Sequence, residues 1–160
     1  MRWLLHNLVA RLSFKVIEHD GEPLFERYLV CRLSNGSAIY IHHYLRSDPD
    51  RGLHDHPWRW AAVLILAGGY NEDRMRGFGT DGPNIVRNRR LPGCAYWLTG
   101  SDFHSLLIAD GRTSWSLFAH GPYRKPWGFL RPTRAESGRV AWFYERAKPY
   151  LEIDAGKPSA

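Results

Sequence analysis

The segment Leu53-His54-Asp55-His56-Pro57-Trp58 stands just ahead of an apolar run, residues 61–67, which the turn Gly68-Gly69 closes. On an extended strand, its two histidines at positions i and i+2 point to the same face. Imidazole is the commonest protein ligand for a first-row transition metal, and His104 lies far downstream in another apolar stretch. The pattern predicts a metal site inside a β-barrel. The alternative is a solvated turn around Asp55, with the histidines on the surface.

The length and composition predict one all-β domain over residues 1–160. Seven Trp, eight Tyr and seven Phe supply bulky side chains for a core or a lined cavity. Fifteen Gly and ten Pro imply many turns, which favours strands over a helix bundle. Tight turns separate short strand-like stretches, so we expect a sandwich or jelly-roll barrel. The stretches are residues 27–33, 37–44, 60–67, 70–74, 84–90, 95–98, 103–109 and 113–120.

The two ends of the chain are expected to depart from this β pattern. A short amphipathic N-terminal helix is predicted over residues 1–14. Polar residues interrupt its apolar run and no small-residue cleavage site follows, which disfavours a signal peptide. Residues 140–148 fit either a final strand or a short helix, and residues 152–160 are expected to form a frayed tail. The apolar face of the predicted helix carries Leu4, Leu5, Leu8 and Leu12.

The charge and the cysteine content narrow the classes of partner. Lys and Arg number 22 against 16 Asp and Glu, a net charge of +6, which attracts anions and leaves nucleic acid, anionic lipid or an acidic small substrate open as partners. The arginines are spread along the chain, which favours a basic solvated surface over a nucleic-acid footprint. Cys31 and Cys94 form no C-x-x-C pair, so a reducing cytoplasmic compartment is expected. No apolar stretch has the length of a membrane-spanning helix.

On these residues the chain resembles the cupin superfamily, whose small β-barrels carry two sequence motifs. The first motif runs Gly, five residues, His-x-His, three or four residues, Glu, six residues, Gly. The sequence His54-Asp55-His56 and the closing Gly68 match it. Asp48 stands at the opening glycine and Ala61 at the glutamate position, so the usual carboxylate ligand is missing.

The second cupin motif runs Gly, five residues, Pro-x-Gly, two residues, His, three residues, Asn. Gly93 and His104 match it, whereas Thr99, Ser101 and Ile108 replace its Pro, Gly and Asn. The histidines and glycines match both motifs at the required spacings, which is a moderately specific signal for the superfamily. The surroundings of His54 and residues 121–129 are also similar to small bacterial and phage cupin-domain proteins. The resemblance implies a cupin-type jelly-roll β-barrel.

The resemblance also implies a divalent metal held by His54, His56 and His104. Some cupin-type thiol dioxygenases are similar in lacking the glutamate. Three neutral imidazoles leave the ion its full charge and leave open positions, as in a catalytic site. Fe(II) is favoured, with Mn, Ni, Zn or Co as alternatives, because imidazole discriminates poorly among them. Glu72 is expected to be a surface residue, with metal ligation as the alternative.

Four further residues are candidates for chemistry near the metal. Arg51 is the best candidate to bind an anionic substrate group, with a solvated loop arginine as the alternative. His120 would act in catalysis if the polar face of its strand looks inward, and would lie on the surface otherwise. His42 and His43 are adjacent, so only one of them can reach the cavity.

Three functions are compatible with these residues. The first is a mononuclear Fe(II)-type dioxygenase acting on a small, anionic molecule. The second is an isomerase or epimerase of sugars or sugar nucleotides, with a histidine as general base. The third is a non-enzymatic module that binds a metal or a small ligand. Fold analogy cannot choose among them. Neither nucleic acid nor a membrane is an expected partner, and a homodimer through edge strands is an expectation by analogy.

Overall fold

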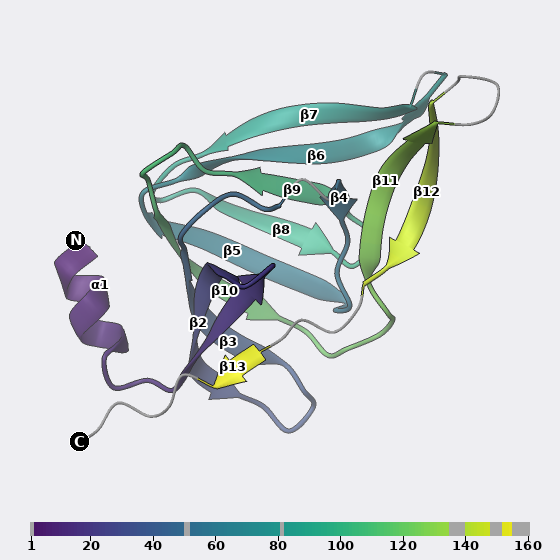
Figure 1. Ribbon diagram of the computed structural model, residues 1–160. Helices are drawn as coiled ribbons and strands as arrows, with labels where there is room; N and C mark the ends of the chain where they lie inside the picture. The colour runs from purple at the N-terminus through teal and green to yellow at the C-terminus, as the bar shows by residue number, and fades with distance from the viewer. Residues whose placement is uncertain (1, 50–51, 81, 135–139, 148–151, 155–160) are drawn as a thin grey trace.

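The computed structural model of the chain describes residues 2–49, 52–80, 82–134, 140–147 and 152–154. They form two antiparallel sheets and one short helix, which confirms the all-β class (Figure 1). The first sheet has the order β13 (Glu152–Asp154), β1 (Phe14–His19), β2 (Glu22–Arg32), β3 (Ala38–Tyr44), β10 (Ser114–His120), β5 (Trp60–Ala67) and β8 (Ala95–Thr99). The second has the order β12 (Val140–Arg146), β11 (Gly128–Arg134), β4 (Leu53–His54), β9 (His104–Leu107), β6 (Tyr70–Gly79) and β7 (Gly82–Arg90).

The chain alternates between the sheets, in the manner of a jelly roll. From β3 it crosses to β4, returns to β5, crosses to β6 and β7, and repeats the pattern through β8, β9 and β10. Strands far apart in sequence thereby become neighbours, among them β4 and β9. In the described part of the chain the sheets do not join into one closed barrel.

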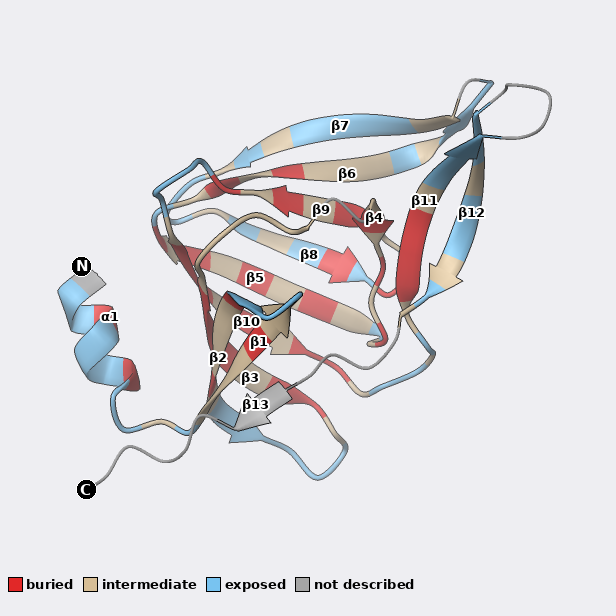
Figure 2. Ribbon diagram, viewed as in Figure 1, coloured by how far each residue is buried: buried red, intermediate tan, exposed pale blue. Residues whose placement is uncertain are grey.

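The core lies between the facing sheets and follows the two-residue period of the strands. Along β5 the residues alternate between buried and half-buried (Figure 2). The buried residues include Ala61, Val63 and Ile65, which belong to the core. They pack with inward-facing residues of β3, β8 and β10. Most of β7, in contrast, is exposed.

The N-terminal helix α1 (Arg2–Val9) is shorter than predicted and lies on the outer face of the first sheet. Leu5 and Val9 pack there against Tyr28 and Trp115, whereas Leu4 and Leu8 of the expected apolar face are exposed. The predicted range 1–14 was too long, because Phe14 already pairs with β2. No described helix has the length and apolarity needed to cross a membrane.

Two other expectations are decided or corrected by strand pairing. Residues 140–146 form the strand β12, which pairs with β11 along its whole length. Residues 152–154 pair with β1 instead of fraying, while residues 155–160 lie outside the described residues. Strands β1 and β11 were not predicted. Pro132 obscures β11 in the sequence, since proline cannot donate to the ladder of a central strand.

Gly68 is required by the turn from β5 to β6. Its φ is +78°, and a Cβ there would clash with the Thr113 carbonyl oxygen. Gly93 has a similar φ of +88°, but a Cβ there would meet nothing within 4 Å. Both glycines stand at positions of the cupin motifs, but only Gly68 combines a left-handed backbone with a close approach of another strand.

We predict that Gly68→Ala destabilises the protein more than Gly93→Ala does. The left-handed backbone alone costs about 1–2 kcal/mol at either position. The clash with Thr113 adds to this cost at Gly68 because a backbone carbonyl must move. Urea denaturation of both variants measures the difference. Equal losses of the free energy of unfolding would contradict the prediction.

Candidate metal centre

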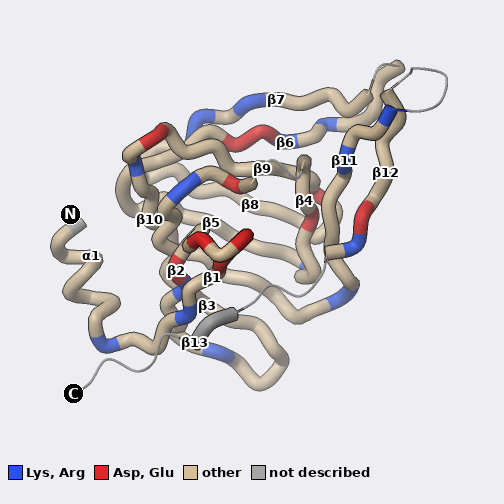
Figure 3. The backbone as a smooth tube through the Cα atoms, in the orientation of Figure 1, with Lys and Arg blue, Asp and Glu red and all other residues tan. Residues whose placement is uncertain are grey.

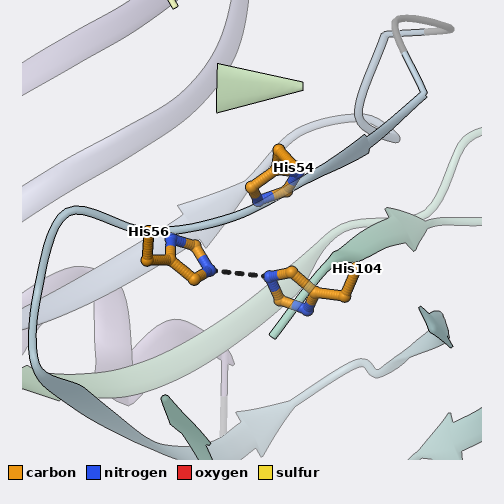
Figure 4. A group of neighbouring side chains, drawn as sticks. All are labelled: His54, His56 and His104. Atoms are coloured by element: carbon orange, nitrogen blue, oxygen red, sulfur yellow. Dashed lines mark hydrogen bonds between the residues drawn. The ribbon is translucent and has the colours of Figure 1, made fainter. Parts of the chain in front are cut away.

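The structure brings His54, His56 and His104 together between the sheets (Figure 4). His54 of β4 and His104 of β9 are direct partners across the strand pair. His56 lies two residues after His54, and its ring centroid is 5.1 Å from that of His54 and 4.9 Å from that of His104. One ring nitrogen of each residue lies within 4.8 Å of the others. The predicted convergence of the three imidazoles is therefore present.

The spacing of one pair of ring nitrogens, on His56 and His104, fits ligation of a common metal ion. Two nitrogens at about 2.0–2.1 Å from one ion lie roughly 2.8–3.4 Å apart in octahedral or tetrahedral geometry. The Nε2 atoms of His56 and His104 are 2.8 Å apart. Burial, and then the nearby His104 and His54, lower the pKa of His56 well below its usual range, so His56 is neutral. Neutral imidazole is the form that binds metals.

Glu72 lies directly behind His104 and is fully buried, so the expectation of a surface residue was wrong. Its Oε1 accepts a hydrogen bond of 2.8 Å from Nδ1 of His104. A carboxylate only accepts, so Nδ1 carries the proton and the lone pair of Nε2 faces the other two histidines. The Glu72 carboxylate orients His104 and is not one of the grouped ligands.

Arg90 compensates the buried charge of Glu72. Its Nε and Nη2 atoms donate to Oε2 at 3.0 and 2.5 Å. Burial alone would raise the pKa of Glu72, but the hydrogen bonds from His104 and Arg90 outweigh it, and the pKa falls below its usual value. The acidic part of β6 thus lies beside basic residues of β7 (Figure 3). The sequence held a signal for the burial of Glu72. It lies two residues after the buried Tyr70, so both side chains point to the same face of the strand.

Asp55 lies between the two motif histidines and points away from their site. It is 1% exposed, which excludes the solvated turn considered as an alternative. Its Oδ1 accepts a 2.7 Å hydrogen bond from the Gly128 backbone N–H, and its Oδ2 pairs with Nζ of Lys125. Because side chains alternate along an extended chain, His54 and His56 face the site and Asp55 faces the other way. There Asp55 binds the backbone of β11 at Gly128.

The three histidines line a cavity of about 690 Å³, a volume typical of small-molecule sites. Aromatic and aliphatic side chains make most of its wall. Asp48 is an exception, with Oδ2 lying 3.6 Å from Nδ1 of His54 and accepting the Leu106 N–H at 2.7 Å. The apolar wall includes Phe25, Tyr44, Trp58, Val63, Tyr96, Leu98, Leu106, Phe118 and Trp127.

His42 is another polar residue that lines this cavity. It is 3% exposed, and its Nε2 has no hydrogen-bond partner among the described residues. Burial, and then Arg27 and His120, lower the pKa of His42 well below its usual range. His43 points outward, with Nδ1 2.9 Å from Glu26. The expectation that only one of the adjacent histidines reaches the cavity is confirmed.

The two predicted catalytic residues have different outcomes. Arg51 lies outside the described residues. His120 is buried on β10, and its Nδ1 donates to the Gly121 carbonyl oxygen at 2.7 Å. The indole of Trp58 stacks between His56 and His120, with ring centroids 5.0 and 4.6 Å away. His120 therefore lines a second, smaller cavity behind Trp58 and not the wall beside the metal-site histidines.

Solved structures with the same fold are found, although the sequence itself matches no known family or curated protein. No protein-family model matches the sequence, and a search of curated proteins finds no match. Fe(II)-HppE with the alternative substrate (S)-1-HPP has a TM-score of 0.54 and 9% identity, covering 70% of this chain and 57% of that chain. The polyketide cyclase RemF from Streptomyces resistomycificus has a TM-score of 0.54 and 16% identity, covering 74% and 80%. The matched region thus spans little more than half of HppE.

The fold and the site together define the class. Two antiparallel sheets, a chain that alternates between them and these structural similarities make the fold a cupin-type double-stranded β-helix. Its three convergent histidines could hold a metal ion. At such low identities the comparisons show the fold alone.

We predict that Glu72→Gln weakens metal binding by about 10- to 100-fold, the usual effect of losing a carboxylate behind a histidine ligand. Glutamine keeps the size of the side chain but removes the charge that holds the proton on Nδ1 of His104. Competition with a fluorescent chelator measures the affinity. Asp73→Asn is the matched control, because it removes a neighbouring carboxylate that pairs with the more exposed Arg87. Equal affinities in the two variants would refute this role for Glu72.

We predict that His42→Phe flattens the pH dependence of stability. The pKa of His42 is lowered in the folded state, so the unfolded state binds more protons once the pH falls below the usual histidine pKa of 6.5, and stability falls as pH drops through that region. One such histidine contributes up to about 1.4 kcal/mol per pH unit. Urea denaturation of the metal-free protein at pH 7, 6 and 5 measures the slope. An unchanged slope in the variant would contradict the prediction.

Proposed function

We propose that the chain is a mononuclear, metal-dependent oxygenase that acts on a small anionic molecule with an apolar body. The observation that carries the proposal is the set of three imidazoles without a carboxylate ligand, facing an aromatic cavity. Three neutral ligands leave a divalent ion its full charge, which favours an anionic substrate. The apolar wall favours a molecule with hydrocarbon or aromatic parts.

Fe(II) is the favoured ion in this proposal, with Mn, Ni, Zn or Co as alternatives, because imidazole accepts all of them. Fe(II)-HppE shares the fold and holds Fe(II), which supports this choice by analogy. A bound Fe(II) would supply redox chemistry with O₂. His54, His56 and His104 would be its ligands.

The residues of the chain would contribute in separate ways. Glu72 keeps the proton on Nδ1 of His104 and so fixes the orientation of that imidazole. Trp58, Phe118 and other rings keep water away, which strengthens charge interactions inside the cavity. His42, whose Nε2 lacks a partner among the described residues, would hydrogen bond to a polar group of the substrate.

His42 also favours a second candidate function, an isomerase or epimerase. His42 lines the cavity and its Nε2 has no partner among the described residues, so this imidazole could take a proton from a substrate carbon as a general base. In that case the metal would be optional.

We predict that a chelator lowers the melting temperature of protein purified without a His tag. When the free metal concentration is 100 times the Kd, binding stabilises the folded protein by about 2.7 kcal/mol. This raises the melting temperature by roughly 5–10 °C for a chain of this size. His56→Ala should abolish this shift, whereas His120→Ala, behind Trp58, should keep it. Identical melting curves of the unmodified protein with and without chelator, after Fe(II) addition, would refute metal binding.

The reaction is tested on the Fe(II)-loaded protein with a panel of small aromatic and aliphatic carboxylates. Uptake of O₂ that requires one of them, and that His56→Ala abolishes, supports the oxygenase. Incorporation of deuterium from D₂O without O₂ uptake, lost in His42→Phe, supports the isomerase instead. Binding of metal or carboxylate without either reaction would leave a binding module and refute both enzymes.

A further inference from the structure

We propose that the smaller cavity behind Trp58 is an anion subsite, which takes the carboxylate or phosphate group of a molecule whose apolar part lies in the larger cavity. This rests on the proposed function only for the statement that the molecule is a substrate. The cavity has a volume of about 240 Å³ and lies against β1, β2 and β3. Its lining combines cationic, hydroxyl and imidazole groups.

Cationic side chains gather at this cavity, and one of them, Lys15, also lies opposite Asp154 of β13. Three of its lining residues, Lys15, Arg27 and Arg32, are cationic, and none of the described lining residues is acidic. Nη2 of Arg32 donates to the Tyr40 hydroxyl at 2.8 Å, and the guanidinium carbon of Arg27 lies 5.4 Å from the centre of the same ring. Two guanidinium groups thus meet at one tyrosine. Their planar donor groups match the geometry of an oxyanion.

The register of β2 explains how the cations gather. Lys15 of β1 lies directly opposite Arg27. Arg27 and Leu29 share a face, but Arg32 would fall on the opposite face of a regular strand. A register shift between Leu29 and Cys31 turns the end of β2, so Arg32 lines the same cavity.

The two cavities adjoin. Lys15, Arg27, Trp58 and Tyr123 line both. The indole of Trp58 has His56 of the metal site on one face and His120 of the smaller cavity on the other. Arg27 pairs across the strands with His42, which faces the larger cavity. A molecule with its anionic group beside Arg27 and Arg32 would therefore extend past Trp58 toward the metal-site histidines.

Calorimetric titration of the metal-free protein tests the subsite directly, with octanoate as the probe and octanamide as its neutral counterpart. We expect octanoate to bind and octanamide to bind at least about tenfold more weakly, because a hydrogen-bonded charge pair is lost. Inorganic phosphate should compete with octanoate. Arg32→Gln and Arg27→Gln should each weaken octanoate by about tenfold and leave octanamide unchanged.

Arg76→Gln is the matched control, because it removes the same charge from an exposed position on β6. Arg32 is itself exposed, so its variant keeps the test valid if Arg27→Gln fails to fold. Equal binding of octanoate and octanamide, no binding of octanoate, or octanoate binding that is insensitive to Arg32→Gln would each overturn the subsite. Octanoate binding that depends on Arg32 in a protein that binds no metal would support the subsite and refute the proposed function.

Discussion

The pairing of β4 with β9 is the constraint on which the candidate site depends. His54 and His104 are separated by about a third of the chain and become direct partners only through this register. A slip of one residue would turn one imidazole to the opposite face of the sheet. The pairing is short, because β4 has only two residues, and it is held by its neighbours: β11 pairs with β4 on one side and β6 with β9 on the other.

Two buried carboxylates lie beside this pairing, each with its own partners. Glu72 lies under His104 and is compensated by Arg90, and Asp55 lies between the motif histidines and binds Lys125 and the Gly128 N–H. A buried charge that loses its partner is strongly destabilising, so each carboxylate specifies its surroundings closely. The three histidines of the candidate site thus lie on a backbone that both charges hold in place.

Two adjoining cavities meet at Trp58, beside the site. The larger one has a mainly aromatic and aliphatic wall, and the smaller one is lined by three cations, of which Lys15 and Arg27 also line the larger one. In a low-dielectric interior, cations interact with an anion more strongly than they do in water. Such an interior would select amphipathic anions over purely polar or purely apolar molecules.

The sequence by itself determined the all-β class, most strands of the core and the three histidines, because alternation and the His-x-His spacing are local properties. The sequence also shows that Ala61 stands at the glutamate position of the first cupin motif. Only the tertiary structure decided that Glu72 is buried behind His104, that His42 faces the cavity and that His120 lies behind Trp58. Likewise, the strand ending at Asp154 and the turn of Arg32 into the smaller cavity depend on pairing with distant strands. Local sequence specifies which side chains share a face, whereas sheet register decides which faces meet.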